Sequence, residues 1–306
     1  MKLSIKWRII GLVILIVIIG LSSLATISSV IIKDKTEETV VNQSETLVNQ
    51  VSTTITTFLS TYESALVNLA SSDDVQSYYN SERVYNSEED QLYRKELKNA
   101  LDSFDAASAF YFATPANTII EPHFDGILTF DATTRSWYQN SSQNPDSVQW
   151  SAPYVDESTG EYTITGSIAV KNGSTVIGIL GVDLFLSDLT TMISNIELGF
   201  EGYPIIVDNS GMAIVHPTLA GQDISSESYI SKILAEDSSK QLQSDIDGKS
   251  HIIVFSKIPQ IGWTIGAIYD EVNLNATADS IQKIIFVITL LILVITFVAL
   301  YFFISR

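Results

Sequence analysis

A cation and two aromatic residues stand almost side by side in "DATTRSWYQN", residues 131–140, where Trp137 and Tyr138 follow Arg135. An Arg guanidinium carries a fixed fork of N–H donors that matches a carboxylate with two parallel hydrogen bonds. The aromatic side chains add flat apolar walls with one polar tip each. Binding of a small carboxylate is therefore one interpretation of the cluster. A structural alternative is that the run simply starts a helix whose aromatic residues pack under a sheet.

A free α-amino acid also needs an anionic partner for its ammonium group. Asp156 in "YVDE" and Asp183 in "GVDL" are the candidates, since they lie on separate expected strands near Tyr154. Together with Arg135 they would meet both charged ends of an amino acid. The alternative for Asp156 is a turn residue placed before "ESTG".

Other chemistry has little support in the sequence. Glu121, His123 and Asp125 alternate in "EPHFDG" and would share one face of a strand, which suits a metal, although a solvated loop is the other interpretation. Three His and no Cys leave little material for zinc, iron–sulfur or thiol chemistry. No nucleophile elbow, phosphate-binding glycine loop or HExxH motif occurs. We therefore expect neither a cofactor nor an enzyme, and the net charge of -18 disfavours nucleic acid as a partner.

Two segments, residues 9–32 and 284–304, are strongly apolar and carry no charge. Each is long enough to cross a hydrocarbon core of about 30 Å as a helix. The first could be a cleaved signal peptide, but its apolar character resumes at Ile27, which favours a retained span. Basic residues in segment 1–8 place the N-terminus in the cytoplasm, although Lys33 and Lys35 weaken that signal. We expect a two-pass protein of the cell membrane, with residues 33–283 outside the cytoplasm and residues 305–306 inside.

A long amphipathic helix is predicted from residue 33 to residue 70, because no Gly or Pro interrupts it and its apolar residues form one stripe. The stripe consists of Val40, Leu47, Val51, Ile55, Phe58, Tyr62, Leu66 and Leu69. It could pair with the same stripe of a second copy, giving a parallel homodimer, or it could pack against the rest of its own chain. A second helix fits Ser87 to Phe104, with Ser87 as N-cap.

The remaining segments indicate an α+β fold with two similar strand-rich modules. Strands are predicted at 108–114, 149–155, 162–170 and 174–184, with a hairpin turn at 171–173 and a helix from Ser187 to Leu198. The order then repeats: residues 202–217 give strand, turn and strand, and residues 250–272 give two strands that end in an acid. Asp183 and Asp270 are the corresponding acids.

The run "TRSWYQ…WSAPYVDESTGEYTITGSIAV…GILGVDL…G…IIVDNSGMAIVHP" resembles the double-Cache sensor domain of transmembrane chemoreceptors, the methyl-accepting chemotaxis proteins. The resemblance covers nearly all of residues 33–283. It implies a long helix (33–72), a membrane-distal module that binds ligand (73–198) and a membrane-proximal module that relays the signal (199–275). Similar domains also serve histidine kinases and cyclic-dinucleotide enzymes.

The resemblance also implies roles for single residues. Arg135 and Trp137 would hold the ligand carboxylate, while Tyr138, Tyr154, Asp156 and Asp183 would hold the ammonium group or wall the pocket. Phe130 stands where members of this kind tend to have a Tyr, so one ammonium contact is lost. An amine, a methylated amino acid or another carboxylate therefore remains open as the ligand.

The expected function is a membrane-anchored sensor that binds an amino acid or related amine. The competing hypotheses are an extracellular hydrolase or transferase tethered to the membrane, and a structural membrane protein with a degenerate pocket. A chemoreceptor would continue into a cytoplasmic relay after the second span. Either this chain is a fragment, with cytoplasmic signalling partners, or it acts by pairing with other receptors.

Overall fold

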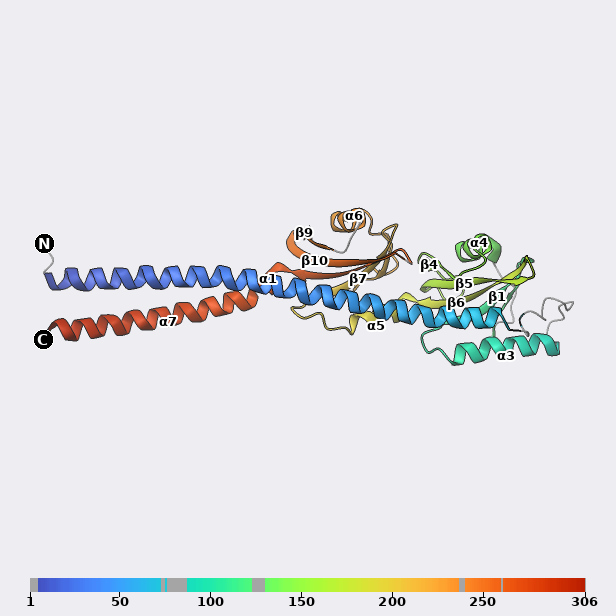
Figure 1. Ribbon diagram of the computed structural model, residues 1–306, viewed down its shortest axis with the longest axis horizontal. Helices are drawn as coiled ribbons and strands as arrows, with labels where there is room; N and C mark the ends of the chain where they lie inside the picture. Colours follow the sequence, from blue (N-terminus) through green and yellow to red (C-terminus); the bar gives the residue numbers. More distant parts are fainter. Residues whose placement is uncertain are drawn as a thin grey trace.

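The computed structural model describes residues 5–72, 75, 87–122, 130–236, 240–259 and 261–305. One helix, α1 (Ile5–Ala70), runs along most of the molecule, and two sheets lie along its second half (Figure 1). A second long helix, α7 (Glu271–Ser305), lies beside the first half of α1, so both termini are at one end. We call the sheet farther from the termini the distal sheet and the nearer one the proximal sheet.

The distal sheet is antiparallel throughout and has the strand order β2-β1-β6-β5-β3, with β4 also paired to β5. Helix α4 (Ser136–Gln143) packs on one face, while α1 and α3 (Glu88–Asp102) pack on the other (Figure 1). The strands are β1 (Ala109–Ala113), β2 (Ile119–Ile120), β3 (Gln149–Trp150), β4 (Tyr154–Val155), β5 (Tyr162–Asn172) and β6 (Thr175–Phe185).

The proximal sheet repeats this topology. Its order is β8-β7-β11-β10-β9. Position by position, these strands correspond to β2, β1, β6, β5 and β3 of the distal sheet. Helix α6 (Ser228–Ala235) covers the outer face and α1 the inner face, and α5 (Leu186–Ser194) connects the two modules. The strands are β7 (Tyr203–Asp208), β8 (Ala213–Val215), β9 (Lys240–Ile246), β10 (Lys249–Ile258) and β11 (Trp263–Asp270). The predicted α+β architecture of two like modules is confirmed.

The buried face of α1 serves both modules. Its buried residues are Val40, Ser44, Val48, Val51, Ile55, Leu59, Tyr62, Leu66 and Ala70. From Ser44 onward they recur every eleven residues in steps of four, three and four, a period of about 3.67 that a nearly straight helix keeps on one side. The apolar members join one hydrophobic core that runs through both modules. The apolar stripe of α1 thus packs against the sheets of its own chain, which was the alternative to pairing with the stripe of a second copy.

A hydrogen-bonded contact joins α1 to the last strand before α7. The hydroxyl oxygens of Ser44 and Tyr269 lie 2.7 Å apart, and both residues are buried. The Ser44 hydroxyl also lies 2.6 Å from the Val40 carbonyl, and the Tyr269 hydroxyl lies 3.3 Å from the Leu198 carbonyl, so the two hydroxyl hydrogens are shared among three contacts. Strand β11 ends at Asp270 and α7 begins at the next residue, so Tyr269 stands two residues before the start of α7.

The structure corrects two predicted elements and adds two that were not predicted. The single strand at 149–155 is two short strands, β3 and β4, because Pro153 has no N–H to continue the ladder. The hairpin turn consists of Gly173 and Ser174, with Gly173 at φ +62, and so lies later than 171–173. Helix α6 and strand β9 were not predicted: α6 has no side-chain N-cap bond, and β9 is a polar edge strand.

Both long helices contain a segment that is long and apolar enough to cross a membrane, and neither segment is buried against the described protein. The two helices are in contact near the sheets, where Lys33 Nζ lies 3.5 Å from a carboxylate oxygen of Asp279. The described ends of the two segments lie on the same side of the molecule (Figure 1).

Replacing Leu59 by Ala should destabilise the chain by about 2–5 kcal/mol, because Leu59 is 1% exposed within the shared core and its loss leaves a cavity. Thr57→Ala, on the exposed side of the same helix turn, should change stability by no more than about 0.5 kcal/mol. Denaturant unfolding of the detergent-solubilised chain measures both values. Equal effects of the two substitutions would contradict the shared-core role of α1.

Candidate functional site

The outer face of the distal sheet collects polar side chains from three neighbouring strands. Successive strand residues point to opposite faces, so Tyr111 of β1, Thr165 of β5 and Asp183 of β6 share this face. Thr165 stands directly opposite Asp183, and Tyr111 stands opposite Gly181. A Cβ at Gly181 would lie 2.5 Å from the Tyr111 ring, so this glycine leaves room for the ring to cross β6 toward Asp183.

Asp183 is the central acid of this face. Only 7% of it is exposed, and its Oδ1 accepts hydrogen bonds from the Tyr111 hydroxyl at 3.0 Å and from Thr165 Oγ1 at 2.6 Å. The Tyr154 hydroxyl lies 2.7 Å from Thr165 Oγ1 and extends the network to β4. Burial raises the pKa of Asp183 to about 7, although the two hydrogen bonds oppose the shift. At neutral pH this acid is therefore ready to ionise when a cation approaches.

Two further carboxylates act on Asp183 electrostatically. Both Asp156 and Glu121 raise its pKa, as like charges do at short range. Burial and then the charge of Asp156 raise the pKa of Glu121 in turn, while Arg94 opposes the shift. The three acids thus form one negative region at this edge of the sheet. Such a region would favour an ammonium group.

Asp156 itself shapes the turn after β4. Its Oδ1 accepts four hydrogen bonds, from the backbone N–H and hydroxyl groups of Ser158 and Thr159, at 2.6–3.1 Å. Burial acts to raise the pKa of Asp156, but these hydrogen bonds outweigh it and hold the pKa below its ordinary value. Asp156 is therefore a turn residue, as the alternative interpretation had it, and it also stays ionised near Asp183.

Arg135 stands at the N-cap position of α4. Its guanidinium lies over the Phe130 ring, 4.7 Å from the centroid, and Nη2 donates to Glu157 Oε1 at 2.7 Å. Phe130, which lacks the hydroxyl of a Tyr, thus supplies a flat support for the cation. The other guanidinium N–H groups have no hydrogen-bond partner among the described residues. They remain open to an acceptor.

Trp137 and Tyr138 pack against the sheet below α4. Both are buried, and the Trp137 ring makes edge contacts with Tyr111 at 5.2 Å and with Tyr138 at 5.8 Å between centroids. The Trp137 carbonyl accepts from Ser167 Oγ at 3.0 Å, which fixes the start of α4 on β5. Trp137 and Tyr138 thus pack their rings against the sheet, as the structural alternative for this run predicted. The same packing brings them beside Tyr111 and the Asp183 network.

Of the predicted residues, the structure brings Trp137, Tyr138, Tyr154, Asp183 and Phe130 to one face of the sheet, with Arg135 and Asp156 at its border. Sequence reasoning missed Tyr111, Thr165 and Glu157, and it considered Glu121 only as a metal ligand. Strand alternation could have placed Thr165 beside Asp183 if the register had been known. His123 and Asp125 lie outside the described residues, so the metal alternative stays untested.

The Cache domain family model, in its double-Cache form dCache_1, matches residues 28–278. Two similar proteins of Bacillus subtilis (strain 168) are methyl-accepting chemotaxis proteins. McpC is 28% identical over 292 residues, which is 95% of this chain and 43% of McpC. TlpB is 26% identical over 179 residues, which is 58% of this chain and 26% of TlpB.

Solved chemoreceptor ligand-binding domains share the fold. The domain of Mlp24 with asparagine has a TM-score of 0.62 and 22% identity, and the match covers 81% of this chain and 99% of that one. The domain of Pseudomonas fluorescens CtaA with L-isoleucine has a TM-score of 0.60 and 22% identity, covering 80% and 97% of the two chains. The domain of Pseudomonas aeruginosa PctB with L-Arg gives 0.60 and 20% identity, covering 76% and 94%.

The family match and the topology agree. The chain spans less than half the length of the two curated relatives described above, and the matched region contains both sheets and the part of α1 that carries them. Two sheets of the same strand order lie on one long helix, as the resemblance to the double-Cache domain implied. The chain belongs to the Cache domain family, in its double-Cache form.

Proposed function

We propose that residues 33–283 are the extracytoplasmic sensor of a two-span chemoreceptor and bind a free amino acid or a related small amine on the distal sheet. One observation supports this most: the short segment from Tyr154 to Glu157 contacts both ends of the candidate site. The Tyr154 hydroxyl meets Thr165, which holds Asp183, and Glu157 meets Arg135. A zwitterion placed along this segment would have a carboxylate for its ammonium group and a guanidinium fork for its carboxylate.

The aromatic residues complete the site. Trp137, Tyr138 and Tyr111 form an apolar wall, and Tyr154 adds a phenol beside the acid network. Ligand-binding sites commonly combine such apolar walls with a few polar groups that set the orientation of the ligand. The ligand-binding domains of Mlp24, CtaA and PctB were solved with asparagine, L-isoleucine and L-Arg, which adds support for this ligand class.

Segments 9–32 and 284–304 would be the two spans, with residues 1–8 and 305–306 in the cytoplasm. Support comes from the antiparallel, side-by-side placement of α1 and α7 and from the exposed apolar segments at the ends where the two termini lie. Because the α1 stripe is filled within the chain, a homodimer would form through these spans and the polar face of α1. The similarity to methyl-accepting chemotaxis proteins favours a chemotaxis output over a histidine kinase or cyclic-dinucleotide enzyme.

Signalling would pass from the sheets to α7. Strand β11 continues directly into α7, and the Ser44–Tyr269 contact holds that junction against α1. Receptor-type helix shifts are on the order of 1–2 Å, and a ligand can drive one only through different affinity for the two states. A ligand that binds one state ~100-fold better has about 2.7 kcal/mol available for this.

Arg135→Ala should abolish amino-acid binding, and Arg135→Lys should weaken it by at least about tenfold, because Lys keeps the charge but loses the planar fork. Calorimetry on the full chain in nanodiscs, against each common amino acid and a set of small amines, measures both. Lys98→Ala, an exposed cation on α3 paired with Asp102, is the control and should bind like the wild type. Wild-type binding by Arg135→Ala would contradict the assigned role of Arg135, and no heat with any ligand at millimolar concentration would contradict the site.

Amino-acid binding should release a proton near pH 6. Asp183 has a pKa of about 7 in the free protein, so it is mostly protonated at about pH 6, whereas an ammonium group binds its ionised form. Affinity should therefore fall about tenfold as the pH falls from about 8 to about 6. Calorimetry in two buffers with different ionisation enthalpies counts the released protons. Asp183→Asn should bind weakly with no proton release, whereas equal release in this variant would assign the proton to another group.

A further inference from the structure

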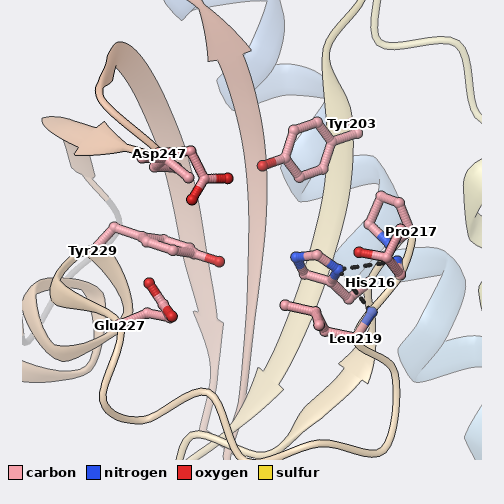
Figure 2. A pocket seen from close by; sticks show the side chains of 9 residues that line it. Tyr203, His216, Pro217, Leu219, Glu227, Tyr229 and Asp247 are labelled. Carbon is pink, nitrogen blue, oxygen red and sulfur yellow. Dashed lines mark hydrogen bonds between the residues drawn. The ribbon is translucent and has the colours of Figure 1, made fainter.

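A cavity lies on the outer face of the proximal sheet, in the other module from the distal site (Figure 2). Its volume is about 420 Å³, and its lining includes Tyr203, His216, Leu219, Glu227, Tyr229 and Asp247. These residues come from four places: the start of β7, the segment after β8, the start of α6 and the β9–β10 turn. The cavity therefore joins the two ends of the sheet order, β8-β7 and β10-β9.

The tight β9–β10 turn presents Asp247 to this cavity. Asp247 has φ +53 and the following Gly248 has φ +77, the left-handed pair that a two-residue hairpin turn requires. Asp tolerates this backbone conformation better than most residues, and the Asp245 carboxylate accepts the Gly248 N–H at 2.8 Å. The Asp247 side chain points across the sheet toward Tyr203 and Tyr229 (Figure 2).

His216 supplies a buried donor. Its Nδ1 accepts the backbone N–H groups of Thr218 and Leu219, both at 3.1 Å, so Nδ1 carries no proton. The neutral ring must then carry its hydrogen on Nε2, the nitrogen that faces the cavity in Figure 2. His216 is 8% exposed, and burial lowers its pKa, which keeps the ring neutral. Nε2 has no hydrogen-bond partner among the described residues.

Tyr229 supplies a second buried polar group. The residue is 3% exposed, and its hydroxyl points into the cavity without a partner among the described residues (Figure 2). Burial raises the pKa of Tyr229 to about 12, and the nearby Tyr203, Glu227 and Asp247 add to the shift, so the phenol stays neutral. The hydroxyl is not among the fully buried side-chain atoms that lack a partner, so solvent in the cavity reaches it, and a ligand with a polar group can take the place of that water.

The charge of the cavity is negative. Glu227 and Asp247 are exposed at its rim, and neither has an ion-pair partner among the described residues. No Lys or Arg contributes to the described lining. An anionic ligand would therefore meet two carboxylates and no cation.

We propose that this cavity is a second ligand site, which takes a small primary amine whose other end carries a hydroxyl or carbonyl group. The ammonium group would donate its three N–H groups to Glu227, Asp247 and a tyrosine hydroxyl. His216 Nε2–H would donate to the neutral oxygen of the ligand. A quaternary amine has no N–H to donate, and a second charged carboxylate on the ligand would be repelled.

Such a ligand would connect both halves of the proximal sheet. It would bridge the β7–β8 side, through Tyr203 and His216, to the β9–β10 side, through Asp247. Strand β11, which continues into α7, lies between these two sides. The proximal site could thus act on α7, as the distal site would, but with a cationic amine in place of a zwitterion.

Calorimetry with ethanolamine on the full chain in nanodiscs tests this proposal. Ethanolamine should bind, whereas ethylene glycol, which lacks the ammonium group, and tetramethylammonium, which lacks N–H donors, should not. The double variant Glu227→Gln, Asp247→Asn should lose at least tenfold in affinity, and Asn keeps the left-handed turn at 247 accessible. Tyr229→Phe should weaken binding severalfold while keeping the ring in the core.

Two matched controls separate this site from others. Glu45→Gln, an exposed acid on α1, should leave ethanolamine binding unchanged. Asp183→Asn, which removes the distal carboxylate for an ammonium group, should also leave it unchanged, even if the distal site proves not to bind amino acids. The proposal is overturned if ethanolamine gives no heat at millimolar concentration, if the double variant binds like the wild type, or if Asp183→Asn abolishes the binding.

Discussion

The straight buried face of α1 is the constraint on which the rest of the fold depends. An eleven-residue spacing keeps its buried residues on one side, from Val40 to Ala70, along both sheets. Two antiparallel sheets of identical strand order can therefore share one helix and one continuous core. The outer face of each sheet is covered by a short helix and carries one of the two proposed ligand sites, because α1 occupies the inner face.

The position of α1 on the inner face also explains why polar side chains gather on the outer faces of the sheets. Strand alternation sends Ile164 and Leu184 toward α1 and sends Thr165 and Asp183 outward, so an acid can be buried on the outer face without entering the main core. The apolar covering from α4 then desolvates that acid, which is the cause of its raised pKa. In the proximal sheet the same arrangement desolvates Tyr229.

Much of the fold was predictable from sequence because it depends on local patterns. The uninterrupted helix, the Ser87 cap and the long hairpin of β5 and β6 all follow from periodicity and turn residues. Strand β9 was missed because a polar edge strand has no apolar signal. The site was predictable only in part: Asp183 was identified, but its contact with Tyr111 depends on strand register and on the space above Gly181, which no single sequence reveals.

The central claim is that ligand on the distal sheet moves α7 relative to α1. The chain has no Cys, so Lys33→Cys combined with Asp279→Cys places one clean pair where the native side chains already approach to 3.5 Å. The measurement is the rate of disulfide formation in nanodiscs, with and without a saturating mixture of the common amino acids. The account predicts a rate that changes with ligand and a response that Arg135→Ala removes. An identical rate with and without ligand, in a protein that calorimetry shows to be occupied, would contradict it.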